Sequence, residues 1–180
     1  MQFTIGGNGN IADREPDTAF TPPGTKIPTI IFEFRPHHQS FVALDEWCRE
    51  YLFTPGVRQV IAFKMLETDA RLIAGVVVQY GRDANGGVEI VDAVSFGERP
   101  VDPQRLPAIQ NELRQLPLRT RDQFLDNQNP WNAIDNPFLT IPRAEMIFNA
   151  NPALIAPVGP DLQLDLFRII RYYTMAYIQS

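Results

Sequence analysis

Runs of apolar residues divide residues 29–96 into strands and one helix. Thr29–Phe34 is an apolar, β-branched run between two prolines, which predicts a buried strand. After Ser40, apolar residues recur at helical spacing from Phe41 to Leu52, which predicts a helix with Ser40 as its N-cap. Three further strands are predicted at Arg58–Leu66, Leu72–Tyr80 and Val88–Phe96.

A hairpin turn and several short elements complete the predicted secondary structure. The sequence GRDANGG predicts a hairpin turn between the last two strands, because asparagine and glycine tolerate the positive φ of such turns. The run DTAF near the N-terminus is expected to form a short strand. Short helices are predicted at Pro107–Leu116 and Pro142–Phe148. A C-terminal helix is predicted after Asp161, from an apolar stripe that starts at Leu162 and includes Leu166.

A strand, a helix and a second strand, followed by a meander, predict an α/β (α+β) domain with a central mixed β-sheet flanked by helices. No shift in composition marks a boundary, so residues 1–180 are expected to form a single domain. Its core is expected at about residues 14–96, with a C-terminal helical elaboration after it.

Charge and composition narrow the function classes. The net charge of −5 argues against bulk nonspecific binding of nucleic acid, although a local basic groove stays compatible with it. The single cysteine, Cys48, forms no internal disulfide, which fits a reducing compartment. The sequence contains no signal peptide and no apolar run long enough to span a membrane, so we expect an intracellular protein that does not contact membranes.

The candidate chemistry lies around the strand IIFEFR. Side chains alternate across a strand, so Glu33 and Arg35 share one face, and Glu33 is desolvated if that face is covered. Asp17 would lie on an adjacent strand, bringing two carboxylates close together, which suits a hard divalent ion such as Mg²⁺. Arg35 or Lys64 would then stabilise the charge that develops on a phosphate.

Pro16-Asp17 followed by Glu33-Phe34-Arg35 resembles the PD-(D/E)XK signature of restriction-endonuclease-like nucleases. The wider context REPDTAF, IPTIIFEF and LDEWCREYLFTPGVRQVIAFKM is similar to the bacterial putative restriction endonuclease family and to uncharacterised eukaryotic relatives. The resemblance covers about Arg14–Leu66. It implies a restriction-endonuclease-like core, Asp17 and Glu33 as ligands of Mg²⁺ or Mn²⁺, and hydrolysis of phosphodiester bonds in nucleic acid.

This chain departs from the signature at the lysine, which is Arg35 here. Arginine stabilises negative charge but is a poor base, so Lys64 is the candidate for a migrated lysine. The structural alternatives are a turn aspartate for Asp17, an ion pair with Arg35 or Lys64 for Glu33, and a sheet-edge position for Lys64.

The functional alternative is a catalytically inactive nuclease-fold protein that serves as a protein-interaction or regulatory module. Its partner would be a protein rather than nucleic acid, and a homodimer is compatible with either function.

Overall fold

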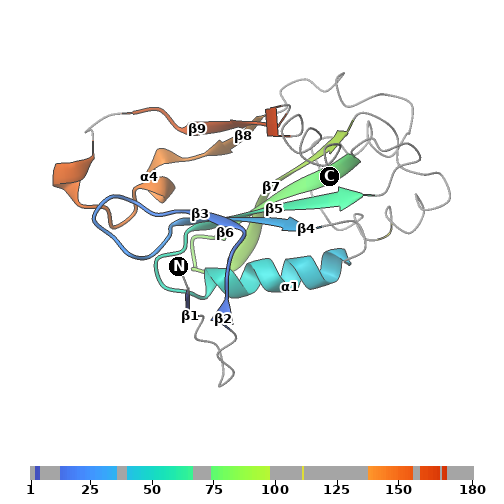
Figure 1. Cartoon of the computed structure of the whole chain (residues 1–180), viewed down its shortest axis with the longest axis horizontal. Coiled ribbons are helices and arrows are strands. Elements are labelled where there is room, and N and C mark those ends of the chain that lie inside the picture. Colours follow the sequence, from blue (N-terminus) through green and yellow to red (C-terminus); the bar gives the residue numbers. More distant parts are fainter. Residues whose placement is uncertain are drawn as a thin grey trace.

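A mixed five-stranded sheet forms the centre of the protein (Figure 1). The computed structural model describes residues 3–4, 13–35, 40–66, 74–97, 111, 138–155, 159–166 and 168–169. The strand order is β3-β4-β5-β6-β7, in which β4 and β5 run parallel and the other neighbouring pairs are antiparallel. The strands are β3 (Thr18–Phe20), β4 (Ile30–Arg35), β5 (Gln59–Leu66), β6 (Ala74–Arg82) and β7 (Val88–Gly97). The prediction of an α+β domain with a mixed sheet is therefore confirmed.

Helix α1 (Phe41–Leu52) connects the two parallel strands and covers one face of the sheet. Its N-cap is Ser40, whose hydroxyl oxygen accepts a hydrogen bond from the Ala43 N–H at 3.2 Å, as predicted. At the other end the Arg82 guanidinium donates to the Leu52 carbonyl, which satisfies one of the free carbonyls of the last turn. Phe41, Leu44 and Cys48 are among the residues that α1 buries against the sheet.

The opposite face of the sheet is covered by a second, two-stranded sheet (Figure 1). Its strands are β8 (Phe138–Ile141) and β9 (Leu162–Asp165), separated by the short helix α4 (Arg143–Met146) and a 3₁₀ turn η2 (Pro152–Leu154). Leu139 and Ile141 of β8 are fully buried against the central strands. Near the N-terminus, β1 (Phe3–Thr4) and β2 (Asp13–Arg14) form a separate small ladder.

The prediction of a helix beginning at Leu162 is wrong for its first turn. Residues Leu162–Asp165 form β9, which pairs antiparallel with β8, and among the described residues that follow, Leu166 and residues 168–169 are helical. The rest of the predicted C-terminal helix lies outside the described residues. The apolar residues Leu162 and Leu164 fit the period of two of a strand as well as the period of about 3.6 of a helix. The strand forms because this segment pairs with the edge of β8. The elaboration after residue 137 is therefore partly a β-ladder.

The remaining terminal predictions have mixed outcomes. The short helix predicted at Pro142–Phe148 is confirmed as α4, one residue later at its start and two residues earlier at its end. The helix predicted at Pro107–Leu116 lies outside the described residues, apart from residue 111. Among the described residues, no helix combines the length and the apolar character needed to cross a membrane.

Candidate functional site

The candidate residues come together at the carboxyl end of the parallel strand pair. On β4, Glu33 and Arg35 point toward α1, because they alternate with Phe32 and Phe34, which pack on the opposite face. Arg35 is the register partner of Lys64 on β5, so both project toward the α1 side. Asp17 directly precedes β3, whose first residue pairs with Phe32, and this places Asp17 alongside Glu33.

Asp17 connects the start of β3 to the end of β4. Its Oδ2 accepts a hydrogen bond from the Phe34 N–H at 2.7 Å and lies 3.4 Å from Nη1 of Arg35. The Asp17 side chain is 41% exposed. Asp17 therefore links the start of β3 to β4 through a hydrogen bond and also belongs to the charged cluster. Its role is different from that of a turn aspartate, which was the structural alternative.

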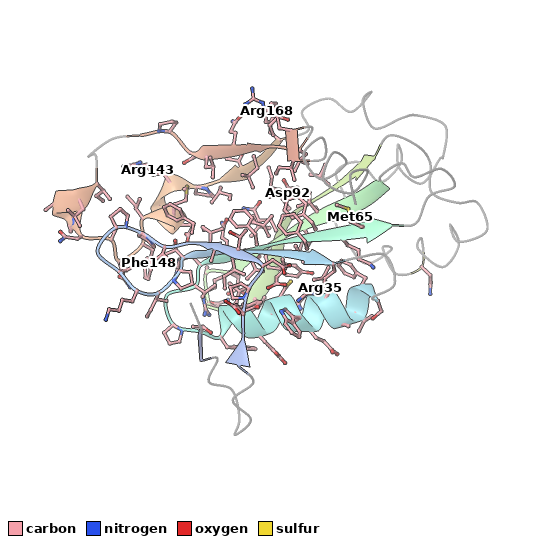
Figure 2. The ribbon with its side chains drawn as sticks, viewed as in Figure 1. Arg35, Met65, Asp92, Arg143, Phe148 and Arg168 are labelled. Carbon is pink, nitrogen blue, oxygen red and sulfur yellow. The ribbon has the colours of Figure 1, made fainter. Side chains whose placement is uncertain are left out.

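The Arg35 guanidinium lies between the two carboxylates. Its Nη2 is 2.7 Å from Oε2 of Glu33, and its Nη1 reaches Asp17 and also donates to the Phe34 carbonyl at 3.2 Å. The guanidinium carbon lies 4.9 Å from the centre of the Trp47 ring, a cation–π contact with α1. Figure 2 shows Arg35 between the end of β4 and the helix. The ion pair between Glu33 and Arg35, one of the alternatives from the sequence, is thus present.

Burial dominates the electrostatics of Glu33. The side chain is 0% exposed, and loss of hydration raises its pKa. The opposing influences are hydrogen bonding from Tyr51, the charge of Arg35 and hydrogen bonding from Trp47, whereas the charge of Asp17 adds to the rise. Apart from the Arg35 ion pair, neither oxygen of Glu33 has a hydrogen bond of regular geometry within the described part of the chain. The net effect is an upward shift of the Glu33 pKa.

Lys64 is buried on a central strand. It is 2% exposed, and β5 is the third of the five strands, with β4 on one side and β6 on the other. The alternative in which Lys64 lies at a sheet edge with its ammonium in water is therefore wrong. The five-strand order, which the sequence alone does not reveal, is the reason.

Trp47 and Tyr51 belong to this site, although their spacing in the sequence predicts only apolar positions of a helix. They lie four residues apart on α1 and contact each other edge to face, with ring centres 6.4 Å apart. Both act on the Glu33 carboxylate, and burial together with Glu33 raises the pKa of Tyr51. A signal was available, because a carboxylate in a covered strand requires donors and the facing helix is where they must come from.

The side chains that could act as metal ligands test the predicted Mg²⁺ or Mn²⁺ site. Among the described residues, no three or more histidine, cysteine, aspartate or glutamate side chains group so as to hold a metal ion. Asp17 and Glu33 are the two carboxylates of the cluster, and the guanidinium of Arg35 contacts both. In this arrangement the single positive charge of Arg35 already lies between the two carboxylates, where a metal ion would have to bind.

Comparisons of the chain with protein-family models, with curated proteins and with solved structures find no match. The class defined by the structure is therefore an α+β domain with a mixed sheet and a buried cluster of charged residues.

Proposed function

We propose that the domain has a restriction-endonuclease-like core without hydrolytic activity and acts as a protein-interaction or regulatory module. The observation that carries the proposal is the position of Arg35, which contacts Asp17 and Glu33 at 3.4 and 2.7 Å. These two carboxylates are the metal ligands that the nuclease resemblance implies. The guanidinium places one positive charge between the two carboxylates, in the position that a divalent ion would otherwise take.

The burial of the cluster supports this function. Glu33 is 0% exposed, so its carboxylate offers no open coordination position to a metal, and Lys64 at 2% exposure does not present its ammonium to a phosphate in solvent. Binding a hydrated Mg²⁺ at Glu33 would require Arg35 to leave its ion pair and its contact with Trp47. Arginine also remains protonated at neutral pH, so it does not replace the motif lysine as a base.

The proposed relationship to nucleases rests on order and topology. Asp17 precedes an edge strand, Glu33 lies on the next strand, and α1 then leads into a parallel third strand. The PD-(D/E)XK signature has the same order along the chain: the aspartate, then the strand with the glutamate, then a helix and a further strand.

The test is calorimetric titration with MgCl₂ and MnCl₂, combined with cleavage assays on plasmid DNA, single-stranded DNA and RNA. The variants are Arg35→Lys, which restores the motif lysine, and Arg49→Lys as a matched control. Arg49 pairs with Asp45 at 2.8 Å, and its guanidinium contacts the Tyr80 ring and the Val88 carbonyl rather than Asp17 or Glu33. The wild type and Arg49→Lys are expected to show neither metal binding nor cleavage. Cleavage by the wild type that Glu33→Gln abolishes would overturn the proposal.

A metal-dependent nuclease is the second candidate, and one observation favours it. Asp17 and Glu33, picked from sequence for their chemistry, contact opposite nitrogens of the same guanidinium. If substrate phosphate draws Arg35 outward, Mg²⁺ or Mn²⁺ would take its position, and Arg35 or Lys64 would stabilise charge at the phosphate. Titrations are therefore repeated with an uncleavable phosphorothioate oligonucleotide present. Metal binding that appears only with the oligonucleotide and disappears in Asp17→Asn would support this candidate.

A further inference from the structure

A pocket of about 280 Å³ opens at the end of the sheet opposite to the Arg35 cluster. Its apolar walls are Ile27, Pro55 and Phe148, from the loop before β4, the turn after α1 and the segment after α4. Figure 2 shows Phe148 well separated from Arg35 along the direction of β4. The pocket and the charged cluster are therefore different places on the protein.

Specific contacts hold the pocket walls in place. The Arg58 guanidinium stacks on the Phe148 ring at 4.4 Å and pairs with Glu145 of α4 at 2.5 Å. The Thr29 hydroxyl donates to the Met146 carbonyl at 2.7 Å, which ties the start of β4 to the same segment. These contacts connect residues more than 80 positions apart in the chain, so the pocket is preformed by the fold.

Two polar side chains in the lining are unused within the structure. Lys26 and Asn149 line the pocket, and neither side chain forms a hydrogen bond or an ion pair within the described part of the chain. Among the described residues of the lining, Lys26 is the one ionisable residue, on a chain whose net charge is −5. Asn149 has a φ of 58°, which presents its amide from a tight left-handed turn. A ligand with an acidic group beside an apolar body matches this lining.

Exposed apolar side chains extend the surface beyond the pocket. Ile27 is 46% exposed, and Phe53, two residues before Pro55, is 63% exposed. Leu154 is 59% exposed and lies against Gly24, next to the loop that lines the pocket. Exposed apolar side chains beside a pocket are typical of surfaces that contact proteins. Ile27 lines the pocket and Leu154 lies beside the same loop, so exposed apolar side chains adjoin the pocket on that side.

We propose that this pocket binds a segment of a partner protein, with an aromatic or branched apolar side chain in the pocket and a neighbouring carboxylate on Lys26. The proposal rests on the proposed binding function, for which it names the contact surface. Apolar burial supplies the affinity, and the Lys26 charge selects acidic over basic segments.

The experiment is an NMR titration of the ¹⁵N-labelled full chain with two capped dipeptides, N-acetyl-Phe-Asp-amide and N-acetyl-Phe-Lys-amide. The variants are Lys26→Glu and Ile27→Ser, both at exposed positions. The matched controls are Arg168→Glu, an 81% exposed charge outside the pocket, and Val42→Ser on the exposed face of α1. The spectra themselves report whether each variant is folded.

We expect the acidic dipeptide to shift the amide signals of Lys26, Gly56 and Asn149, and to bind about threefold more tightly than the basic one. Lys26→Glu should reverse this preference, Ile27→Ser should weaken both peptides, and the controls should match the wild type. Absence of shifts at the pocket, or a preference that Lys26→Glu leaves unchanged, would overturn the proposal. The peptide titration does not depend on hydrolysis. Nuclease activity of the wild type in the cleavage assays would therefore overturn the proposed function but not this binding surface. Failure of the peptides to bind would overturn this surface but not the proposed function.

Discussion

Glu33 and Arg35 form an ion pair within a single strand, with Oε2 and Nη2 2.7 Å apart. Residues two apart on a strand share a face, so the buried carboxylate and its cation are placed together by the alternation of β4 alone. Helix α1 covers the pair and adds Trp47 against the guanidinium. A charged pair of this kind fits a covered sheet because the two charges enter the interior together.

Removal of the cation from this pair is expected to be costly. In Arg35→Ala, Glu33 stays buried without its counter-charge, and we expect a loss of about 3 kcal/mol in the free energy of unfolding. Glu33→Gln in the same chain removes the buried charge and should restore part of that loss. Urea unfolding of the wild type, the two single variants and the double variant measures the coupling.

The matched control for this cycle is Arg49→Ala. Arg49 also contacts a carboxylate at 2.8 Å, but its side chain is 37% exposed, so its loss should cost less than about 1 kcal/mol. If Arg35→Ala and Arg49→Ala lose equal stability, the Glu33 pair is not held in a low-dielectric environment.

Stability should fall as pH rises above the ordinary range of a glutamate. The folded state raises the pKa of Glu33 above 4.5, mainly through burial, so the native protein holds this proton at pH values where the unfolded chain has released it. The contribution of Glu33 is therefore fully present below pH 4.5 and is lost as pH rises through the folded pKa. Urea unfolding of the wild type and Glu33→Gln from pH 4 upward tests this, and equal slopes in both proteins would contradict it.

Asp17 is expected to act on the pKa of Glu33. The charge of Asp17 contributes to the upward shift, so Asp17→Asn should lower the Glu33 pKa. NMR titration of the side-chain carboxyl carbon of Glu33 measures the change. Because Asp17 is 41% exposed, the substitution itself should cost no more than about 1 kcal/mol. An unchanged Glu33 titration would mean that solvent screens the Asp17 charge.

Much of the sheet was predictable because its signals are local. The strand before the helix, the Ser40 cap and the GRDANGG hairpin each depend on residues near one another in sequence. In the hairpin, Asp83 Oδ1 accepts from the N–H groups of Asn85 and Gly87 at 2.8 Å, and Gly86 has a φ of +80°. Such features specify their own geometry and need no tertiary partner.

The candidate site was predictable only in part, because the burial and the contacts of its residues depend on long-range packing. Alternation along β4 placed Glu33 and Arg35 on one face, and PD before a strand placed Asp17 near them. The strand order that buries Lys64 and the arrival of Trp47 and Tyr51 over Glu33 depend on tertiary packing. The same is true of β9, where pairing with β8 outweighs a helical apolar stripe.

A comparison of Gly56 and Gly86 separates the effect of close packing in the pocket wall from the effect of backbone strain. Both have positive φ, +99° and +80°, so alanine is strained at either position, by about 1 kcal/mol. At Gly56 an added Cβ would also lie 2.8 Å from Ile27 Cγ2, whereas at Gly86 it would meet no atom within 4 Å. Gly56→Ala should therefore lower the free energy of unfolding more than Gly86→Ala, in urea unfolding of both. Gly56→Ala should also shift the amide signals of Lys26 and Ile27, because the wall must move to accept the methyl group. Equal losses for the two variants, with no shift at Ile27, would show that Ile27 yields freely and that the pocket wall is not fixed.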